Sequence, residues 1–281
     1  MGLITKAVDL VNVAVRQIQR YQTHEDAPIK TRFEHFNANA LGGIFKGNII
    51  TIGAISGSGK SYVLQQIEED MFNKQLNPSC DDYVLLRCNW EMTVFKLLIR
   101  KLKRKLRKSA TEILFKSPEG DDLNRFKDVC DSERSDKIFY LEDPTDPKTW
   151  YDAVRAFLEE NKHKKHVVVT IDHIALVRDV FGSKKTAMDT LIENINMLKK
   201  EFINVSFIIL SQLNRDIEGR TDIQNLAPKR SDLYNSDTIF HISDIVLVLH
   251  NPFKLGHSLY MNIPGLAVDS EGNTLDNRYA H

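Results

Sequence analysis

The sequence predicts an α/β fold in which a mainly parallel sheet is covered by helices on both faces. Six short runs have the β-branched, apolar composition of buried strands: 48–54, 83–88, 137–141, 166–171, 205–210 and 244–250. Most of the stretches between them have a helical pattern, at 60–73, 93–109, 147–161 and 186–203. This alternation is typical of a parallel sheet that is buried on both sides. Such sheets bind ligands at the carboxyl ends of their strands, where candidate site residues are therefore expected.

The composition is that of an ordinary globular protein. Of the 281 residues, 42% are hydrophobic and 27% are charged, which argues against global disorder. Basic and acidic residues number 38 each, so net charge gives no bias toward nucleic acid or a membrane. No segment approaches the roughly 18 to 20 apolar residues that span a bilayer. We therefore expect no membrane partner. The three cysteines, Cys80, Cys88 and Cys130, cannot all form pairs, so we expect buried, inert thiols in a cytoplasmic protein.

Residues 1–39 are expected to form an N-terminal amphipathic helix and a linker, ahead of one large domain at 40–281. Apolar residues recur at a 4-3-4-3 spacing that lines one face of a helix: Ile4, Val8, Val11, Val15 and Ile18. The polar stretch 23–46, with Pro28 and two adjacent glycines, places this helix outside the main domain. The apolar face then either folds back on the chain's own core or docks on a neighbouring subunit.

The segment GAISGSGKS, residues 53–61, has the strand–loop–helix context of a phosphate-binding loop. Its expected nucleotide contacts are Ser56, Gly57, Ser58, Gly59, Lys60, Ser61 and Tyr62. Lys60 should reach the β and γ phosphates, and Ser61 should offer its hydroxyl to Mg2+. Ala54 replaces the first glycine of the usual pattern, which is tolerable at a strand exit. Gly59 holds the more demanding position, because the chain turns tightly there.

Polar residues at three later strand ends can complete a hydrolytic site. Asp172 ends an apolar run and suits a carboxylate that holds Mg2+ through water. Glu91, at a strand end beside the P-loop strand, can act as general base for an attacking water, although by itself it is equally a charge at a helix start. Gln212 can sense the γ phosphate. Water activation together with a sensor favours hydrolysis over phosphoryl transfer to a small acceptor.

Taken in order, these motifs resemble the RecA-like motor domain of the DnaB-type hexameric replicative helicases of superfamily 4. The resemblance covers about residues 40 to 249. It rests on AISGSGKS, on NWEM for the family's S-L-E-M, on FYLEDPT, on VVVTIDHIALV for D-Y-L-Q-L, on SQLNR for S-Q-L-x-R, and on PKRSDLYNSDTIFHISDIVLVL. Each motif is weak alone, whereas their ordered combination is specific.

The resemblance implies a RecA-like P-loop NTPase that hydrolyses ATP to translocate on single-stranded DNA and unwind duplex DNA during replication in the bacterial cytoplasm. It implies catalytic roles for Glu91, Lys60 and Gln212, and Mg2+ ligation by Ser61 and Asp172. Six subunits would form a ring, with ATP between neighbours and a primase or helicase loader as partner. The N-terminal helix would dock on the adjacent subunit. Loops in the channel would contact DNA through Lys184, Lys185, Arg215, Arg220, Lys229, Arg230 and Tyr234.

Three departures from the family pattern leave alternatives open. The family's amino-terminal primase-interacting domain is absent from this sequence. Tyr234 and Asp237 replace an arginine and a glycine of D-L-R-E-S-G; the tyrosine could stack on a base, whereas the aspartate would repel phosphate. The trans-acting K-x-R-x-G finger is expected beyond the last strands, but the sequence ends at His281 without it, and Arg278 lacks the flanking residues; a motor domain truncated at its C-terminus is one expectation. A ring subunit that binds ATP with little turnover is therefore one alternative. A RecA-like DNA-dependent ATPase that is not a helicase, such as a recombinase or a loader, is another.

Two basic segments have less specific interpretations. Residues 96–108 contain eight basic residues and no acid, and four leucines give the expected helix an apolar edge. The cationic face either binds phosphates of a nucleic acid or membrane, or is neutralised by acids elsewhere in the fold; the second interpretation is favoured. His163 and His166 have one potential metal-binding spacing but no third ligand, which favours two polar surface residues.

Overall fold

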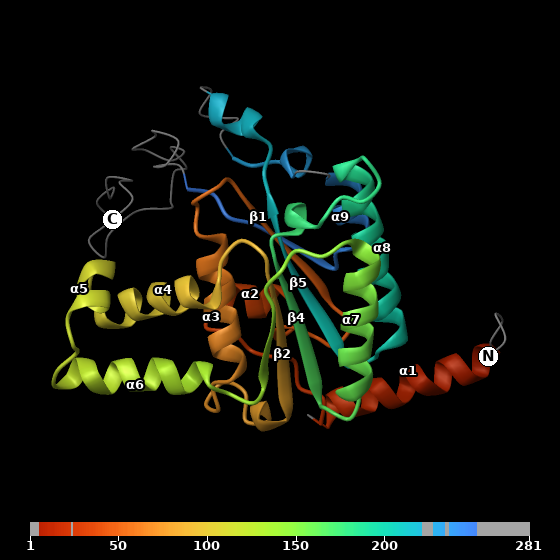
Figure 1. The fold of residues 1–281 in the computed structure, drawn as a ribbon. Coiled ribbons are helices and arrows are strands. Elements are labelled where there is room, and N and C mark those ends of the chain that lie inside the picture. Colours follow the sequence, from red (N-terminus) through yellow and green to blue (C-terminus); the bar gives the residue numbers. More distant parts are fainter. Residues whose placement is uncertain (1–5, 24, 221–226, 234–235, 252–281) are drawn as a thin grey trace, which may run out of the picture.

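The computed structural model describes residues 6–23, 25–220, 227–233 and 236–251, and in this part of the chain the strands form one parallel sheet (Figure 1). Their order across the sheet is β3-β2-β4-β5-β1-β6. The strands are β1 Ile49–Ala54, β2 Tyr83–Asn89, β3 Ile138–Leu141, β4 His166–Asp172, β5 Val205–Gln212 and β6 Ile245–Val248. The prediction of six strands in a mainly parallel sheet is confirmed.

The helices account for most of the chain between the strands. They are α1 Ala7–Gln22, α2 Glu34–Asn39, α3 Lys60–Met71, α4 Val94–Leu106, α5 Ala110–Phe115, α6 Asp121–Glu133, α7 Pro147–Glu160, α8 Lys184–Glu201 and α9 Ser236–Ile242. Short 3-10 turns lie at η1 Cys80–Asp82, η2 Ile174–Leu176, η3 Arg215–Gly219 and η5 Arg230–Asp232. The four predicted helices correspond to α3, α4, α7 and α8. No helix among these is long and apolar enough to cross a membrane.

Two hydrophobic cores lie on opposite faces of the sheet. Side chains alternate between the faces along each strand: Phe207 packs in the core formed with α7 and α8, whereas its neighbour Ile208 packs in the core formed with α3. Trp150 of α7 and Ile67 of α3 are the corresponding helix residues, and both are buried. In Figure 1, α3 lies to the left of the sheet and α7 and α8 lie to the right. This arrangement confirms the expected helix layers on both faces.

The strand order corrects one expectation about Glu91. β2, which leads to Glu91, is separated from β1 by β4 and β5, so it does not lie beside the P-loop strand. Chain order does not determine strand order in a parallel sheet, because each helical crossover can pass over several strands. Glu91 nevertheless reaches the same edge of the sheet, since its backbone N–H donates to the carbonyl of Asp172 at 3.2 Å.

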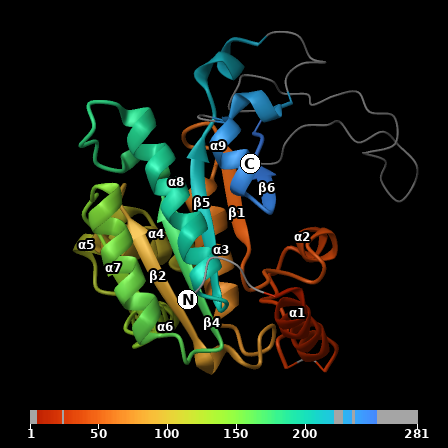
Figure 2. The same ribbon diagram turned by 90° about the vertical axis from the view of Figure 1, so that its right-hand side faces the viewer.

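The N-terminal helix α1 stands outside both helix layers. None of its residues is buried, and the stripe of Val8, Val11, Val15 and Ile18 is 45–59% exposed. Figure 2 shows α1 at the lower right, away from α7 and α8. The following segment packs against the domain, because Ile29 is fully buried in the core beside α3. The apolar face of α1 therefore does not fold back on the core; the domain boundary after residue 39 stays a prediction.

A buried ion network joins β2 to the helices on the α3 side of the sheet. The guanidinium of Arg87, 4% exposed, donates to Glu68 Oε2 at 3.0 Å and to Glu133 Oε2 at 2.6 Å. Lys101 of α4 also pairs with Glu133. Burial opposes ionisation of Glu133, but these cations hold its pKa at about 2. The network fastens α6, which the sequence did not predict, to β2 and α4.

We expect the substitution Arg87→Met to destabilise the fold by about 3 to 5 kcal/mol, because it leaves the buried carboxylate of Glu68 without its counter-charge and leaves Glu133 with Lys101 alone. The free energy of unfolding, measured by urea titration, tests this. Arg155→Met is the matched control, since Arg155 forms an exposed pair with Glu201 and its loss should change little. Equal stabilities of the two variants would contradict the prediction.

Candidate functional site

The predicted phosphate-binding loop lies between the end of β1 at Ala54 and the start of α3 at Lys60. Gly57 and Gly59 have φ angles of 72° and 94°, which other L-residues rarely adopt, so both glycines are required by the backbone. Ala54 is fully buried within the strand, in keeping with a tolerated methyl at the strand exit. The first amides of α3 have no partner within the helix and can face an anion.

Lys60 lies inside the loop that it would use to bind phosphate. Its side chain is largely buried, and its Nζ donates to the carbonyl of Ala54 at 2.9 Å and to that of Ile55 at 3.2 Å. The hydroxyl oxygen of Ser58 is buried and has no hydrogen-bond partner among the described residues. A buried polar atom without a partner costs free energy, so this hydroxyl suits a polar ligand in the loop. Ser56 and Tyr62 are exposed beside it.

Ser61 and Asp172 meet as the sequence predicted. Asp172 ends β4, and the Ser61 hydroxyl is near enough to its carboxylate to favour the ionised form. Burial raises the pKa of Asp172 to about 6, and the carboxylates of Glu91 and Glu68 act in the same direction, whereas Ser61 opposes it. Within the described chain, Asp172 Oδ1 is buried without a hydrogen-bond partner.

These two oxygen donors fit Mg2+. This ion prefers hard oxygen ligands, and it commonly uses only one or two protein groups together with phosphates and water. No cluster of three or more His, Cys, Asp and Glu side chains able to hold a metal occurs in the described ranges. The unpartnered oxygen of Asp172 beside the Ser61 hydroxyl is therefore the arrangement expected for an ion shared with a bound nucleotide.

Gln212 lies beside the phosphate loop. It ends β5, which pairs with β1 so that Gln212 is opposite Ala54. The next residue, Leu213, donates its backbone N–H to the Ala54 carbonyl at 3.1 Å. The Gln212 amide also contacts the ring of His173, with 3.4 Å between their Nε2 atoms. A side chain at this position can respond to a phosphate in the loop.

Glu91 is exposed directly beyond β2, at the same sheet edge. The backbone N–H groups of Trp90 and Glu91 both donate to the Asp172 carbonyl, at 3.0 and 3.2 Å. These two hydrogen bonds hold Glu91 beside Asp172, the predicted metal ligand. The Glu91 carboxylate also affects the ionisation of Asp172 and of His173. The structure therefore brings Lys60, Ser61, Asp172, Glu91 and Gln212 to one edge of the sheet.

The residues predicted to contact DNA divide between two segments at this edge. Lys184 and Lys185 are exposed at the start of α8, where Lys184 Nζ donates to the Val177 carbonyl. In the second segment, Lys229 and Arg230 are exposed, and the Arg230 guanidinium lies 4.1 Å from the centre of the Phe240 ring. The backbone of Arg215 begins η3.

Arg220 is held in an internal ion pair. Its Nη1 donates to Asp232 Oδ2 at 2.9 Å, and its Nη2 contacts Asp232 Oδ1 at 2.5 Å. The Lys229 amide donates to Asp232 Oδ2 at 2.6 Å. Burial opposes ionisation of Asp232, but Arg220 and this amide hold its pKa below the ordinary value. Asp232 thus binds both Arg220 and the backbone of Lys229.

Two residues of this edge were not singled out from the sequence. His173 directly follows Asp172, where the family has tyrosine, and that substitution was the available signal. Asp232 lies within the SDL motif, but nothing local in the sequence indicated that it binds Arg220. Tyr234, Ile4 and Arg278 lie outside the described residues.

The basic helix α4 is partly neutralised by acids, as the favoured interpretation expected. Lys101 pairs with Glu133, and Arg104 with Glu69, while Lys96 and Lys103 are exposed.

The interpretation of the two histidines as surface residues is right for His163 and wrong for His166. His166 is buried in β4, 2.7 Å from Ser206 Oγ, and burial lowers its pKa to about 3.

Comparison with known proteins identifies the family. The family model described as DnaB-like helicase C terminal domain matches residues 28–259. The chain belongs to this family, whose ATPase domains bind nucleotide. Among curated relatives, the replicative DNA helicase DnaB of Helicobacter pylori is 25% identical over 260 residues, which cover 89% of this chain and 48% of that protein. The DnaB of Mycobacterium leprae is 29% identical over 124 residues, 43% of this chain and 20% of its own length. The chain spans about half, or less, of the curated relatives that it matches.

Solved structures share the fold. One solved chain, described as an ATPase domain, superposes with a TM-score of 0.70 at 20% identity, covering 87% of this chain and 84% of that one. A DnaB-like replicative helicase, described together with its interactions with primase, gives a TM-score of 0.68 at 20% identity and covers 93% of this chain and 61% of that chain. The fold is therefore the RecA-like fold that the resemblance implied.

The substitution Asp172→Asn should stabilise the nucleotide-free protein at high pH. Above pH 6 the Asp172 carboxylate is ionised in the folded and in the unfolded protein, and burial makes the ionised form unfavourable in the folded one. Below pH 4 the carboxyl group is protonated in both the folded and the unfolded protein. From a pKa of about 6 against an ordinary 3.8, we expect a gain of about 1 to 3 kcal/mol at pH 8. The gain should vanish as the pH falls from 6 to 4. Urea unfolding with a chelator at pH 4, 6 and 8 measures it, and a loss of stability at pH 8 would contradict it.

Proposed function

We propose that this chain is the motor domain of a DnaB-type helicase, which hydrolyses ATP to translocate on single-stranded DNA and unwind duplex DNA during replication. The observation that carries the proposal is the meeting of Lys60, Ser61, Asp172, Glu91 and Gln212 at one sheet edge. Membership of the DnaB-like family and the RecA-like fold support it. The curated relatives are named replicative DNA helicases.

The chain's own groups divide the work of hydrolysis. The loop amides and the start of α3 bind the phosphates, and Lys60 exchanges its carbonyl contacts for phosphate oxygens. Mg2+, when bound, neutralises charge on the β and γ phosphates. The carboxylate of Glu91 takes a proton from the attacking water. The Gln212 side chain contacts the γ phosphate, so its orientation depends on whether that phosphate is present.

DNA binding is proposed for the two exposed segments at the same edge. Lys184 and Lys185 lie at the start of α8, and Lys229 and Arg230 lie beyond β5. Basic side chains contact the phosphate backbone of DNA and do not distinguish its bases. Binding should therefore be independent of the DNA sequence and should weaken as the salt concentration rises. Arg220 supports the second segment through Asp232.

Assembly into a ring is proposed from the exposed face of α1. The valines and the isoleucine on this face cover no core in their own chain. A neighbouring subunit would bury them in a homo-oligomer, which we propose to be a hexameric ring with ATP between its subunits. A primase or a helicase loader is the proposed further partner, because a similar solved helicase is described with its interactions with primase.

The substitution Glu91→Gln should lower ATP hydrolysis by about 10²- to 10⁴-fold while leaving nucleotide binding intact, because only the proton acceptor is lost. Phosphate release with and without single-stranded DNA measures this, and DNA should stimulate the wild-type chain. Glu160→Gln, at the exposed end of α7, is the control. Wild-type rates in Glu91→Gln, or no DNA stimulation of the wild type, would contradict the proposal.

The substitution Val11→Asp should disrupt assembly, whereas Val13→Asp should not. The two valines are equally exposed, at 58% and 59%, but lie on opposite sides of α1. Burying one valine contributes about 1.5 to 3 kcal/mol, so the first change should weaken association roughly tenfold or more. Sedimentation with ATP and Mg2+ gives the mass of the assembly. Equal masses for the two variants would rule out docking through this face.

A further inference from the structure

His173 is a buried polar residue at the centre of the candidate site. It directly follows Asp172, and only 6% of its surface is exposed. Its Nε2 lies 3.4 Å from Nε2 of Gln212, the proposed sensor of the γ phosphate. Three charged side chains also act on the ring: Glu91, Lys60 and Lys184. His173 therefore contacts or adjoins residues with three different proposed roles: hydrolysis, phosphate sensing and DNA binding.

The hydrogen bonding of the ring follows from its partner. An amide nitrogen only donates, so Gln212 is the donor and His173 Nε2 is the acceptor. A ring nitrogen that accepts a hydrogen bond carries no proton, so the imidazole of His173 is neutral. The proton of a neutral imidazole is then on Nδ1, which is buried and has no partner in the described part of the chain. The contact with Gln212 is the hydrogen bond that the structure gives this ring.

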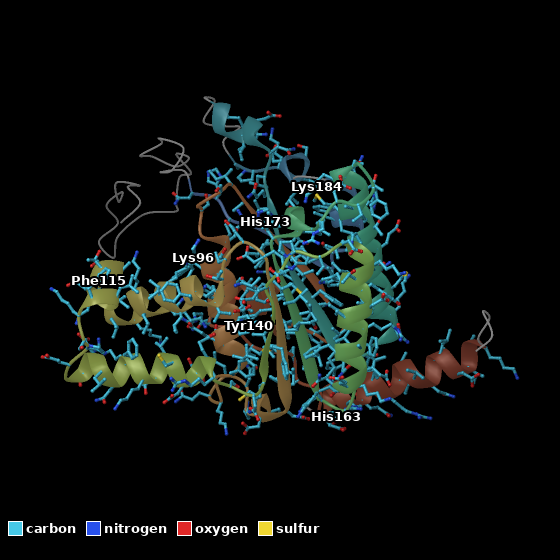
Figure 3. The ribbon with its side chains drawn as sticks, in the orientation of Figure 1. Lys96, Phe115, Tyr140, His163, His173 and Lys184 are labelled. Atoms are coloured by element: carbon cyan, nitrogen blue, oxygen red, sulfur yellow. The ribbon has the colours of Figure 1, made fainter. Side chains whose placement is uncertain are left out.

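The chain beyond His173 connects the ring rigidly to Lys184. The turn η2 begins at Ile174, and the Leu176 amide donates to the His173 carbonyl at 3.0 Å. Ile174 and Val177 are both fully buried, so the residues of this turn pack together and a shift of the ring is passed along the turn. The Val177 carbonyl accepts a hydrogen bond from Lys184 Nζ, at the start of α8. Figure 3 shows His173 and Lys184 in the same upper part of the molecule.

We propose that His173 is a positioning residue that transmits occupancy of the γ-phosphate site from Gln212 to the DNA-binding segment at Lys184 and Lys185. This inference rests on the proposed function and extends it. Gln212, the sensor at the end of β5, then acts on both protein segments that are proposed to bind DNA. It acts directly on the segment with Lys229 and Arg230, which follows β5 in the chain. It acts through His173 on the segment with Lys184 and Lys185, which follows β4.

The physical basis is competition for the Gln212 amide. When this amide turns toward a phosphate, His173 Nε2 loses its donor, and both ring nitrogens are then buried without partners. Unsatisfied buried polar groups are unfavourable, so the ring and the turn that carries it take a different position. The Val177 carbonyl moves with this turn and releases or reorients Lys184. Such coupling requires an element with two arrangements, which this hydrogen bond provides.

Substitutions of His173 separate this role from simple packing. His173→Phe keeps the ring but cannot accept a hydrogen bond. His173→Gln places an amide near the position of Nε2, and His173→Asn places one near that of Nδ1. A packing role would favour the phenylalanine, whereas the proposed role favours the glutamine over the asparagine. His163→Phe is the matched control, because His163 is exposed at the opposite end of the molecule in Figure 3.

The measurement is the affinity for fluorescent single-stranded DNA with ADP and with a non-hydrolysable ATP analogue, both with Mg2+. The ratio of the two dissociation constants reports coupling, because linkage between two ligands is reciprocal. We expect His173→Phe and His173→Asn to reduce this ratio by about 2- to 30-fold relative to wild type. His173→Gln and His163→Phe should keep it. Nucleotide affinity, measured separately, should stay within about threefold in every variant, which also verifies folding.

A double-mutant cycle with Gln212→Ala completes the test. If Gln212 acts through His173, adding His173→Phe to Gln212→Ala should cause little further loss. Additive losses, or a wild-type ratio in His173→Phe, would contradict the relay while leaving the proposed function standing. A wild-type chain whose DNA affinity does not depend on the nucleotide would contradict both.

Discussion

Parallel pairing of β1, β5, β4 and β2 is the constraint on which the candidate site depends. It brings strand ends from distant parts of the chain to one edge, and its hydrogen bonds set their relative heights. Gln212 lies opposite Ala54 because β5 pairs in register with β1. Glu91 reaches Asp172 because the backbone bonds of β2 and β4 continue past the end of the ladder. A shift of one residue in either pair would turn these side chains to the other face of the sheet.

Burial of charge at this edge prepares the site for a ligand. The carboxylate of Asp172 is held where its ionisation is opposed, and Lys60 satisfies its ammonium with backbone carbonyls. Ligand binding stabilises both groups, because a cation places a positive charge near the Asp172 carboxylate and phosphate places a negative charge near the Lys60 ammonium. These interactions are strong in surroundings of low polarity. The ion pairs of Arg87 with Glu68 and of Arg220 with Asp232 stabilise the segments that support this edge.

Much of this could be predicted from local pattern. Strands such as 166–171 and 205–210 are apolar runs of strand length, and the phosphate loop is defined by Gly59, Lys60 and Ser61 in sequence. The helices α5 and α6 were missed because α6 buries only Val129 and is fixed by Glu133 pairing with Arg87. His166 was misjudged because a histidine in a basic stretch has the pattern of a surface residue, whereas its partner Ser206 lies on another strand.

The sequence by itself determined the six strands and the helices α3, α4, α7 and α8 in their order along the chain, the phosphate loop, the amphipathic face of α1 and the family resemblance. Each element and motif depends on residues within a few turns of each other, and the resemblance depends on the order of the motifs along the chain. Only the tertiary structure decided the order of strands across the sheet, the contact of His173 with Gln212, and the capture of Arg220 by Asp232. The physical reason is that such contacts join residues far apart in sequence. Their energies depend on which buried groups the packed sheet brings within hydrogen-bonding distance.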